Sequence, residues 1–383
     1  MNKPAKVFWY CEKWQPGGIQ AVQVNLLRHM PPDEIHFDIA VSEDDTDLFD
    51  EQLKKYGARK VVTLSRRYDS PGKRTLANFF AVARLLRKGG YDAVHFNACH
   101  GVELIYVFWA WLFGIPLRIV HCRNNDIGAG GRSRPIKIAC HEICKRLFGG
   151  CANVKLANSN LAAKWLFTKK ELASGSVQVL NNGIDASRYA FDASVRERVR
   201  AELQAEDAFL VGHIGHFSYQ KNHEYLLEIF ARLREIIPQA RLLLIGSGEG
   251  EPDVRRQAEA LGIADDVIFY GVTNEVPSLL WAMDAFVLPS RFEGFGNVLI
   301  EAQAAGLKCF ASAGVIPEAA KITENLSWLL LDESPAVWAD AIAACANGYP
   351  RKDRTADVAE KGYDISGMAR RLAALYLSGG KKK

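Results

Sequence analysis

Short apolar runs alternate with longer amphipathic stretches along the whole chain. In the first half, the runs that favour strands are Lys6–Tyr10, His36–Val41, Asp92–Phe96, Arg118–Cys122, Val154–Asn158 and Val177–Leu180. In the second half they are Phe209–Gly215, Arg241–Gly248, Val267–Gly271, Asp284–Ser290 and Lys308–Ser312. Helical periodicity fills most of the intervals, as in Thr75–Gly89. This alternation predicts parallel sheets that are covered by helices on both faces.

The alternation restarts after Asn181–Asp192, which marks a junction between two halves. A chain of 383 residues also exceeds the size at which a single core usually stops growing. We therefore predict an α/β protein of two Rossmann-like, doubly wound domains that face each other across a cleft. The predicted domains are residues 1–185 and 186–364, and a helix at about 365–378 is expected to pack back on the first domain.

Composition is that of a soluble globular protein, with 49% apolar and 24% charged residues. The longest apolar run, Leu104–Pro116, is shorter than the roughly 20 residues that span a bilayer, so we interpret it as a buried helix. The N-terminal apolar run is too short for a signal peptide. The cysteines are scattered without a CxxC pair, which argues against a zinc site. We expect a cytoplasmic protein with a peripheral contact to the inner face of the membrane.

Charge is distributed unevenly between the halves. Residues 1–185 hold 26 Lys and Arg against 17 Asp and Glu, whereas residues 186–383 hold 22 against 27. A basic half suggests an anionic partner, although a solvated surface without a partner remains an alternative. The segment Arg134–Gly150 predicts a helix of one of two kinds: a basic amphipathic helix that lies on an anionic membrane, or a helix that packs on the core and exposes its basic side to solvent.

Two glutamates, Glu293 and Glu301, flank a glycine-containing turn that leads from a predicted strand into a helix near Asn297. A helix start exposes unpaired N–H groups that hold phosphate, and Gly294 and Gly296 allow the backbone to come close to a ligand. Carboxylates accept hydrogen bonds from hydroxyls but repel phosphate. The arrangement suits a ligand with hydroxyls at both ends and phosphate between them, such as a nucleotide-sugar.

The segment "EGFGNVLIE" resembles the E-x7-E motif of retaining glycosyltransferases of the two-Rossmann GT-B type, most of all family 4. Further segments in the order of that family are "GGIQAVQVNL" at Gly17, "NNGID" at Asn181, "GHFSYQKNHEYLLEIF" at Gly215, "LLLIGSGE" and "VIFYGVTNEVPSLLWAMDAFVLPS". The resemblance covers nearly the whole chain. It implies transfer of a sugar, a hexose in the simplest case, from a nucleotide-sugar to an acceptor hydroxyl, in polysaccharide or glycolipid assembly.

The resemblance also implies roles for the residues of this motif. Glu301 would bind the ribose hydroxyls, and Glu293 would contact hydroxyls of the donor sugar. Backbone amides would face the diphosphate or the sugar at Phe295, Gly296, Asn297 and Val298.

A departure from the family pattern concerns the cations at the diphosphate. The family uses an arginine and a lysine to neutralise the leaving nucleotide. Lys221 matches the lysine, but His216 stands in the place of the arginine. Arginine is always charged and binds phosphate through two groups, whereas histidine binds through one nitrogen at a time. His216 is either a working substitute or a tolerated replacement.

Other predicted contacts lie after strands of the first half and beside the nucleobase. Gly17 and Gly18 form a glycine loop expected to approach the donor phosphate. The resemblance implies that His121 contacts the transferred sugar, whereas His95 is expected to be structural. The nucleobase is expected to lie beside Tyr270, Gly271 and Val272.

No separate cofactor is expected, because the donor, UDP- or GDP-linked, is itself a substrate. No DxD motif follows a predicted strand, and "DDTD" at Asp44 is assigned to a loop away from the cleft, so we expect no metal. The acceptor is expected to be a glycan or a lipid-linked molecule, and no nucleic acid. Two alternatives remain: a GT-B sugar-nucleotide epimerase or hydrolase, and a non-catalytic partner subunit of a transferase.

Overall fold

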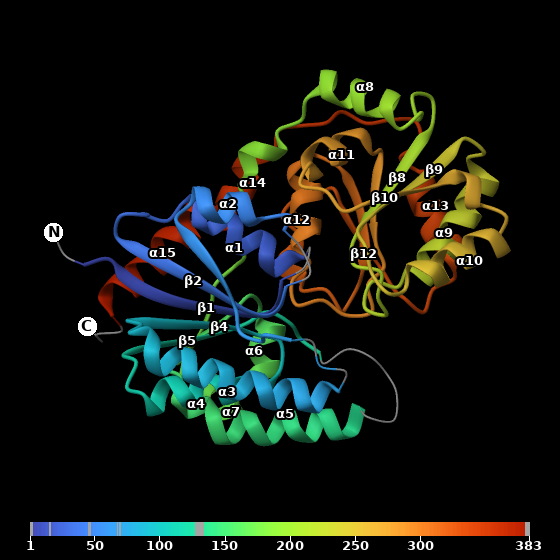
Figure 1. Cartoon of the computed structure of the whole chain (residues 1–383). Coiled ribbons are helices and arrows are strands. Elements are labelled where there is room, and N and C mark those ends of the chain that lie inside the picture. Colours follow the sequence, from blue (N-terminus) through green and yellow to red (C-terminus); the bar gives the residue numbers. More distant parts are fainter. Residues whose placement is uncertain are drawn as a thin grey trace. The chain divides into compact units, whose positions relative to one another are not determined.

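The computed structural model describes residues 3–14, 17–44, 47–66, 68, 70–126 and 134–379. The chain forms two compact units. Unit 1 comprises residues 1–183 and 365–383, and unit 2 comprises residues 184–364. Each unit contains one sheet in which all described strand pairs are parallel (Figure 1). The predicted α/β class with two doubly wound sheets is therefore confirmed.

Unit 1 has a seven-stranded sheet in the order β3-β2-β1-β4-β5-β6-β7. The strands are β1 (Ala5–Trp14), β2 (Ile35–Asp44), β3 (Ala58–Val62), β4 (Ala93–Ala98), β5 (Leu117–Cys122), β6 (Val154–Ala157) and β7 (Val177–Val179). The helices are α1 (Gly18–Arg28), α2 (Asp50–Lys55), α3 (Pro71–Gly89), α4 (Leu104–Leu112), α5 (Arg134–Phe148), α6 (Asn160–Leu166), α7 (Lys169–Ala173) and α15 (Ile365–Ser378).

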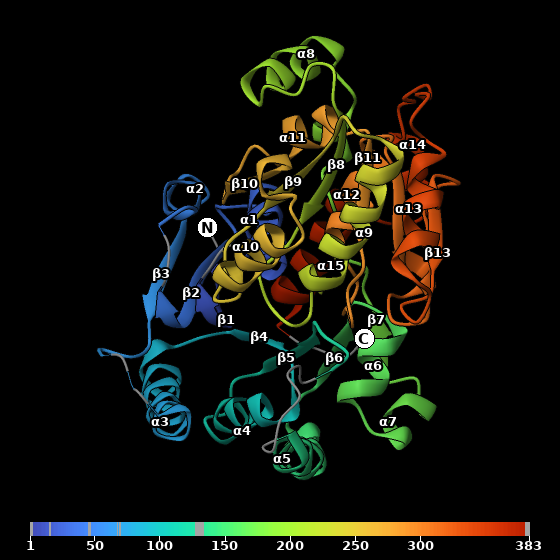
Figure 2. The same ribbon diagram turned by 90° about the vertical axis from the view of Figure 1, so that its right-hand side faces the viewer.

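Alternate residues of β1 build the two cores of unit 1, because side chains of a strand point to opposite faces. Val7 and Trp9 pack into a core with residues of α1 and α15, whereas Phe8 and Tyr10 pack into a core with residues of α3 and α4. Both views show α1 and α15 on one side of this sheet and α3, α4 and α5 on the other (Figures 1 and 2). The buried run of β1 is therefore apolar on both faces, as is usual for parallel strands, whereas β4 also buries the polar His95 and Asn97.

The C-terminal helix α15 belongs to unit 1. The Tyr376 hydroxyl lies 2.6 Å from Nδ1 of the buried His95, and the Tyr376 ring packs edge-on against Phe37 at 5.6 Å. A side chain at Gly183 would collide with the Ile365 backbone at 2.5 Å, so the returning chain needs a glycine there. The last helix thus completes the core that α1 also covers.

Unit 2 has a six-stranded sheet in the order β10-β9-β8-β11-β12-β13. The strands are β8 (Phe209–Ile214), β9 (Ala240–Ile245), β10 (Val267–Gly271), β11 (Ala285–Leu288), β12 (Lys308–Ser312) and β13 (Leu326–Leu329). The helices are α8 (Ala193–Glu202), α9 (His223–Ile236), α10 (Glu251–Ala260), α11 (Val276–Ala282), α12 (Asn297–Ala304), α13 (Pro335–Ala343) and α14 (Thr355–Glu360). The strand order reverses between β8 and β11, and ligands of such sheets bind at the carboxyl ends beside such a point.

Two segments that we singled out in the sequence are helices: the apolar run after Leu104 and the basic segment that begins at Arg134, which forms α5. The apolar run after Leu104 forms α4, which buries Leu104 and Val107 but leaves Trp111 half exposed. It is thus only partly the buried helix that we predicted, because its C-terminal end reaches the surface. Within the residues that the structure describes, no helix is both long and apolar enough to cross a bilayer.

Candidate functional site

The turn between β11 and α12 is held rigidly at the carboxyl edge of the unit 2 sheet. Gly296 caps α12 in the left-handed conformation, with φ of 82°, which a residue with a side chain adopts only under strain. The Phe295 side chain is buried in the core and packs against Tyr363, with ring centroids 5.2 Å apart. The amides at the start of α12 therefore have a fixed direction, as an anion site at a helix start requires.

Glu293 and Lys221 form an ion pair within unit 2. Lys221 Nζ lies 2.6 Å from Glu293 Oε1, and both side chains are largely buried. Ser290 Oγ donates to the same carboxylate oxygen at 2.8 Å, and Gln220 Nε2 donates to Oε2 at 3.2 Å. The structure thus brings together two residues that are far apart in the sequence, and it adds Ser290 and Gln220 as supports that the sequence did not single out.

The turn after β8 approaches its neighbours closely. A side chain at Gly215 would lie 2.9 Å from the Lys221 stem, so a glycine leaves room for this lysine to cross the backbone. The Arg291 amide donates to the Gln220 carbonyl at 2.8 Å, and its guanidinium donates to the Tyr219 carbonyl at 2.8 Å. These bonds join the turn that carries Lys221 to the turn that carries Glu293.

Glu301 lies partly buried on α12 and is held from a segment that the sequence analysis did not assign. The Tyr189 hydroxyl bonds to the Glu301 carboxylate, and Arg188 contributes a nearby positive charge. Burial outweighs both effects and raises the pKa of Glu301 to about 7. Tyr189 and Arg188 belong to the 3-10 turn Ala186–Tyr189, which directly follows the "NNGID" segment. The carboxyl group is therefore near its titration point at neutral pH.

His216 faces a carboxylate of the turn after β9. Its Nε2 lies 3.0 Å from Glu249 Oε2, and the ring is about one-third exposed. A side chain at Gly248 would lie 3.0 Å from the His216 ring, so the two turns are in close contact. Glu249 was not expected from the sequence. It is a carboxylate that a bound diphosphate would have to tolerate or displace.

The end of β10 offers backbone groups and exposed side chains. Gly271 has φ of 82°, and its carbonyl accepts a hydrogen bond from the Gly246 amide at 2.9 Å. The flanking Tyr270 and Val272 are both more than one-third exposed. The main-chain groups at such a strand end can contact the flat ring of a nucleobase, which is the role expected for this segment.

The predicted residues of unit 1 differ in accessibility. Gly17 and Gly18 are exposed at the start of α1, where Gly17 is in extended conformation and its carbonyl accepts from Ala21 N at 3.0 Å. His121, in contrast, is fully buried, with Nδ1 3.3 Å from Nε2 of the equally buried His95. Burial and the nearby Arg123 charge lower the pKa of both rings. A sugar contact by His121 stays a prediction that requires its ring to become accessible.

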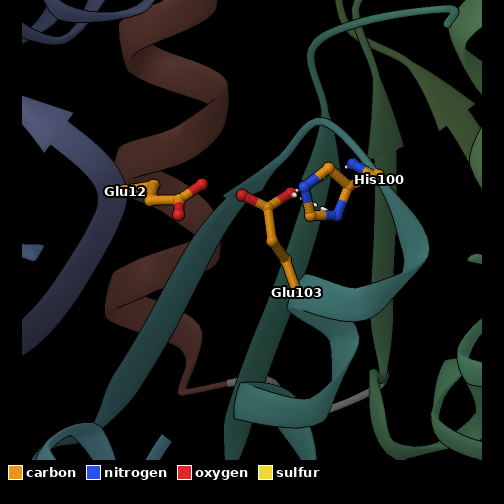
Figure 3. A group of neighbouring side chains, drawn as sticks. All are labelled: Glu12, His100 and Glu103. Atoms are coloured by element: carbon orange, nitrogen blue, oxygen red, sulfur yellow. Dashed lines mark hydrogen bonds and ion pairs between the residues drawn. The ribbon is translucent and has the colours of Figure 1, made fainter. Parts of the chain in front are cut away.

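A carboxylate and histidine group that we did not predict lies at the carboxyl edge of the unit 1 sheet. The ligand atoms of Glu12, His100 and Glu103 all lie within 4.8 Å of one another (Figure 3). Burial and the Glu12 charge raise the pKa of Glu103, whereas His100 opposes the rise. The Arg74 guanidinium lies 3.4 Å from Glu12 and already supplies a positive charge. A divalent ion in this group would therefore compete with Arg74.

The assignment of "DDTD" to a loop was wrong for its first residue. β2 extends to Asp44, so the first aspartate is the last residue of a strand. Its carboxylate pairs with Lys60 Nζ at 2.8 Å. Asp45 and Thr46 lie outside the described residues. The strand is longer than predicted because it continues to pair with β1 through Asp44.

Comparison with known proteins gives a consistent result over both units. Residues 16–188 match the family described as Glycosyltransferase Family 4, and residues 195–362 match Glycosyl transferases group 1. The putative glycosyltransferase EpsF of Bacillus subtilis is 28% identical over 365 residues, which cover 94% of this chain and 93% of EpsF. An Escherichia coli UDP-Gal:alpha-D-GlcNAc-diphosphoundecaprenol alpha-1,3-galactosyltransferase is 23% identical, with 77% and 76% covered.

Solved structures agree in fold. The Anabaena protein HepE, crystallised with UDP and glucose, superimposes with a TM-score of 0.71 at 20% identity, covering 98% of this chain and 97% of HepE. WaaG, a glycosyltransferase of lipopolysaccharide biosynthesis, gives a TM-score of 0.71 at 17% identity, with 96% and 95% covered. The chain therefore belongs to the group 1 and family 4 glycosyltransferases, which have the GT-B fold and use nucleotide-sugar donors.

Proposed function

We propose that the chain transfers a hexosyl group from a UDP- or GDP-linked donor to a hydroxyl of a glycan or lipid-linked acceptor, with retention of anomeric configuration. The observation that carries the proposal is the set of Lys221, Glu293 and Glu301 around the start of α12. The relatives also support it, because the E. coli protein is named for UDP-galactose and a diphosphoundecaprenol-linked acceptor. We assign the nucleotide of the donor to unit 2 and the acceptor to unit 1.

Glu301 and the start of α12 would bind the nucleotide. Ionised Glu301 accepts hydrogen bonds from the ribose hydroxyls, while Tyr189 holds the carboxylate in place. The amides from Phe295 to Val298 would face the diphosphate, and the helix dipole would favour its negative charge. Backbone groups at Tyr270 to Val272 would hold the nucleobase.

Lys221 would change partners when the donor binds. Its ammonium pairs with Glu293 at 2.6 Å. A diphosphate carries more charge than one carboxylate, so the lysine would turn toward it, and the freed Glu293 would accept hydroxyls of the donor sugar. Cleavage of the sugar–phosphate bond then moves negative charge onto the diphosphate, which Lys221, His216 and the start of α12 would stabilise.

The residues of unit 1 would complete the reaction. The Gly17–Gly18 loop approaches the donor phosphate, and His121 contacts the transferred sugar if its ring becomes accessible. The leaving phosphate takes up the proton of the acceptor hydroxyl on the same face of the sugar, so no side chain is assigned as general base. We propose that the reaction needs no metal ion.

The test is a panel of UDP-, GDP- and ADP-linked sugars, incubated with and without glycan and undecaprenyl-diphosphate-linked acceptors. We expect a glycosylated acceptor whose new linkage keeps the anomeric configuration of the donor, as determined by NMR. Release of free sugar and nucleotide at the same rate without acceptor would instead identify a hydrolase or epimerase. Binding of a donor without any turnover would identify a non-catalytic partner subunit.

A further inference from the structure

Three neighbouring helices of unit 1, α3, α4 and α5, carry large apolar side chains that are exposed to solvent. Each is at least half exposed, although most residues of these types are buried elsewhere in the unit. They are Leu76, Phe80, Trp111, Leu112, Ile136, Ile143 and Leu147. Single exposed apolar residues are normal on a protein surface, but a gathered set marks an interaction site.

Helix α5 buries two polar side chains and exposes three large apolar ones. The buried His141 accepts a hydrogen bond from the Gly101 amide at 2.8 Å and stacks on Trp165 at 4.1 Å. The largely buried Lys145 donates to the Trp165 carbonyl at 3.0 Å. The opposite side presents residues spaced by seven and four positions: Ile136, Ile143 and Leu147. A surface helix in water normally shows the reverse pattern, so the outer side of α5 is suited to a non-aqueous partner.

Contacts between aromatic rings link the three helices to one another. Aromatic rings follow one another from Phe80 to Phe79 at 5.3 Å, to Trp109 at 4.8 Å, to Phe108 at 5.4 Å and to Phe148 at 5.7 Å. These rings belong in turn to α3, α4 and α5, which lie side by side in both views (Figures 1 and 2). We call the exposed apolar residues of these three helices, together with the exposed basic residues beside them, the α3–α5 face.

Positive charge accompanies the apolar residues. Helices α3, α4 and α5 expose six Lys and Arg and hold one acidic residue, Glu142; the exposed basic residues are Lys73, Arg84, Arg87, Lys88, Lys137 and Arg146. On α3, exposed Arg84 and Arg87 continue the row of Leu76 and Phe80 at spacings of three and four residues. Long basic side chains beside apolar ones can keep their charged ends at lipid headgroups while their stems lie on the acyl boundary.

We propose that the α3–α5 face docks the enzyme on the surface of an anionic membrane. The basic residues match the charge of anionic headgroups, and the aliphatic and aromatic residues match the acyl boundary, where aromatic side chains are enriched. A polyanion such as nucleic acid would satisfy the charge but not the apolar side of α5. The inference does not depend on the proposed transfer reaction, because none of these residues is assigned to the donor or the acceptor.

The test is co-sedimentation of the full chain with vesicles of phosphatidylcholine alone and with 30 to 50% phosphatidylglycerol. Binding should rise with the phosphatidylglycerol fraction and fall with salt, since surface charges are screened within roughly 10 Å at 0.1 M salt. The double variant Ile143→Gln with Leu147→Gln should bind at least about tenfold more weakly, because two apolar side chains no longer enter the boundary. Arg84→Gln with Arg87→Gln should weaken binding by about tenfold or more.

Matched controls come from exposed residues of unit 2. Ile236→Gln with Leu261→Gln tests a general loss of apolar surface, and Arg198→Gln with Arg232→Gln tests a general loss of charge. Both controls should bind vesicles as the native chain does. All variants should keep their melting temperature and their affinity for the nucleotide-sugar, so that failure of docking is separable from failure of the proposed function.

Three outcomes would overturn the proposal. Vesicle binding that depends on neither the phosphatidylglycerol fraction nor the salt concentration would show that the basic residues do not bind anionic headgroups. Loss of binding in the arginine variant, with native binding in the Ile143 and Leu147 variant, would indicate only a polyanion surface. Absence of vesicle binding, together with a dimer in sedimentation equilibrium that the apolar variant dissociates, would make this face a contact between two copies of the chain.

Discussion

Glu301→Gln should make unit 2 more stable at pH 8 and, at the same time, a weaker nucleotide binder. Burial raises the pKa of Glu301 from 4.5 to about 7. Between these two values the folded chain holds a proton that the unfolded chain releases. Stability therefore falls as the pH rises through this window, and the full loss is present above pH 7.

The pKa shift of Glu301 sets the size of the change in unfolding free energy. One pKa unit corresponds to about 1.4 kcal/mol, so ionised Glu301 costs up to about 3 kcal/mol of unfolding free energy above pH 7. Glutamine has the same shape, can accept from Tyr189 and does not titrate. For a domain of 150 to 250 residues, each kcal/mol shifts the melting temperature by about 2–4 °C, which gives a gain of up to about 10 °C at pH 8.

The assay is a series of thermal melts from pH 4.5 to 8.5 on the native chain and Glu301→Gln. Glu259→Gln, at an exposed position of α10, serves as the control and should show no comparable gain. The difference between native chain and Glu301→Gln should grow as the pH rises and level off above pH 7. A difference that stays constant over the whole range would refute the argument that burial destabilises the ionised carboxyl group.

Ligand binding should show the opposite trend. If ionised Glu301 accepts the ribose hydroxyls, affinity for a nucleotide-sugar should fall as the pH drops through about 7. Glu301→Gln should bind at least about tenfold more weakly at pH 8, since hydrogen bonds to charged groups contribute about 1.5–3 kcal/mol. Its affinity should also lose the pH dependence. Calorimetric titrations at pH 6 and pH 8 measure both effects, and an unchanged affinity would remove Glu301 from the ribose site.

Further predictions concern the cations, the metal and the helix start. Lys221→Ala should lower turnover by about 10²–10³-fold, as for other fixed groups at a developing anion, and steady-state kinetics with one accepted donor would test it. His216→Ala should also lower turnover, whereas His216→Arg should retain it. Equal turnover of the native chain and both variants would place position 216 away from the diphosphate. Activity should survive EDTA, and a loss that magnesium or manganese restores would instead direct attention to Glu12 and its neighbours. Gly296→Ala should lower the unfolding free energy by about 1–2 kcal/mol, because φ is 82° there, and denaturant unfolding would measure it.

The fold could be predicted largely from strand patterning, and the two strands that we missed show where this fails. β3 has the sequence ARKVV, in which two of five residues are basic, so an apolar run is not visible. It lies at the edge of the unit 1 sheet, where the exposed Arg59 pairs with the buried Asp38. β13, with the sequence LSWL, is also an edge strand. β3 and β13 each bury only one residue, so their sequences show no clear apolar run.

The site was predictable where the resemblance supplied a motif, but the supports of each residue were not. The pairing of Lys221 with Glu293 joins turns 72 residues apart, and nothing in either segment indicates this distance. Tyr189 reaches Glu301 only because the segment after "NNGID" folds against α12. His121 ends a strand as expected, yet its ring points into a core shared with His95 and Tyr376. The side to which a buried strand residue points depends on register, which a fully apolar run does not reveal.

The most direct measurement for the central claim is calorimetric titration of the chain with UDP, GDP and ADP and with their sugars. One nucleotide series should bind to a single site, and binding should weaken at least tenfold in both Glu301→Ala and Lys221→Ala while the fold is retained. At 100 times the dissociation constant, the preferred ligand should also stabilise the native chain by about 2.7 kcal/mol. If no nucleotide binds, or if both variants bind as well as the native chain, unit 2 does not hold the donor in the way proposed.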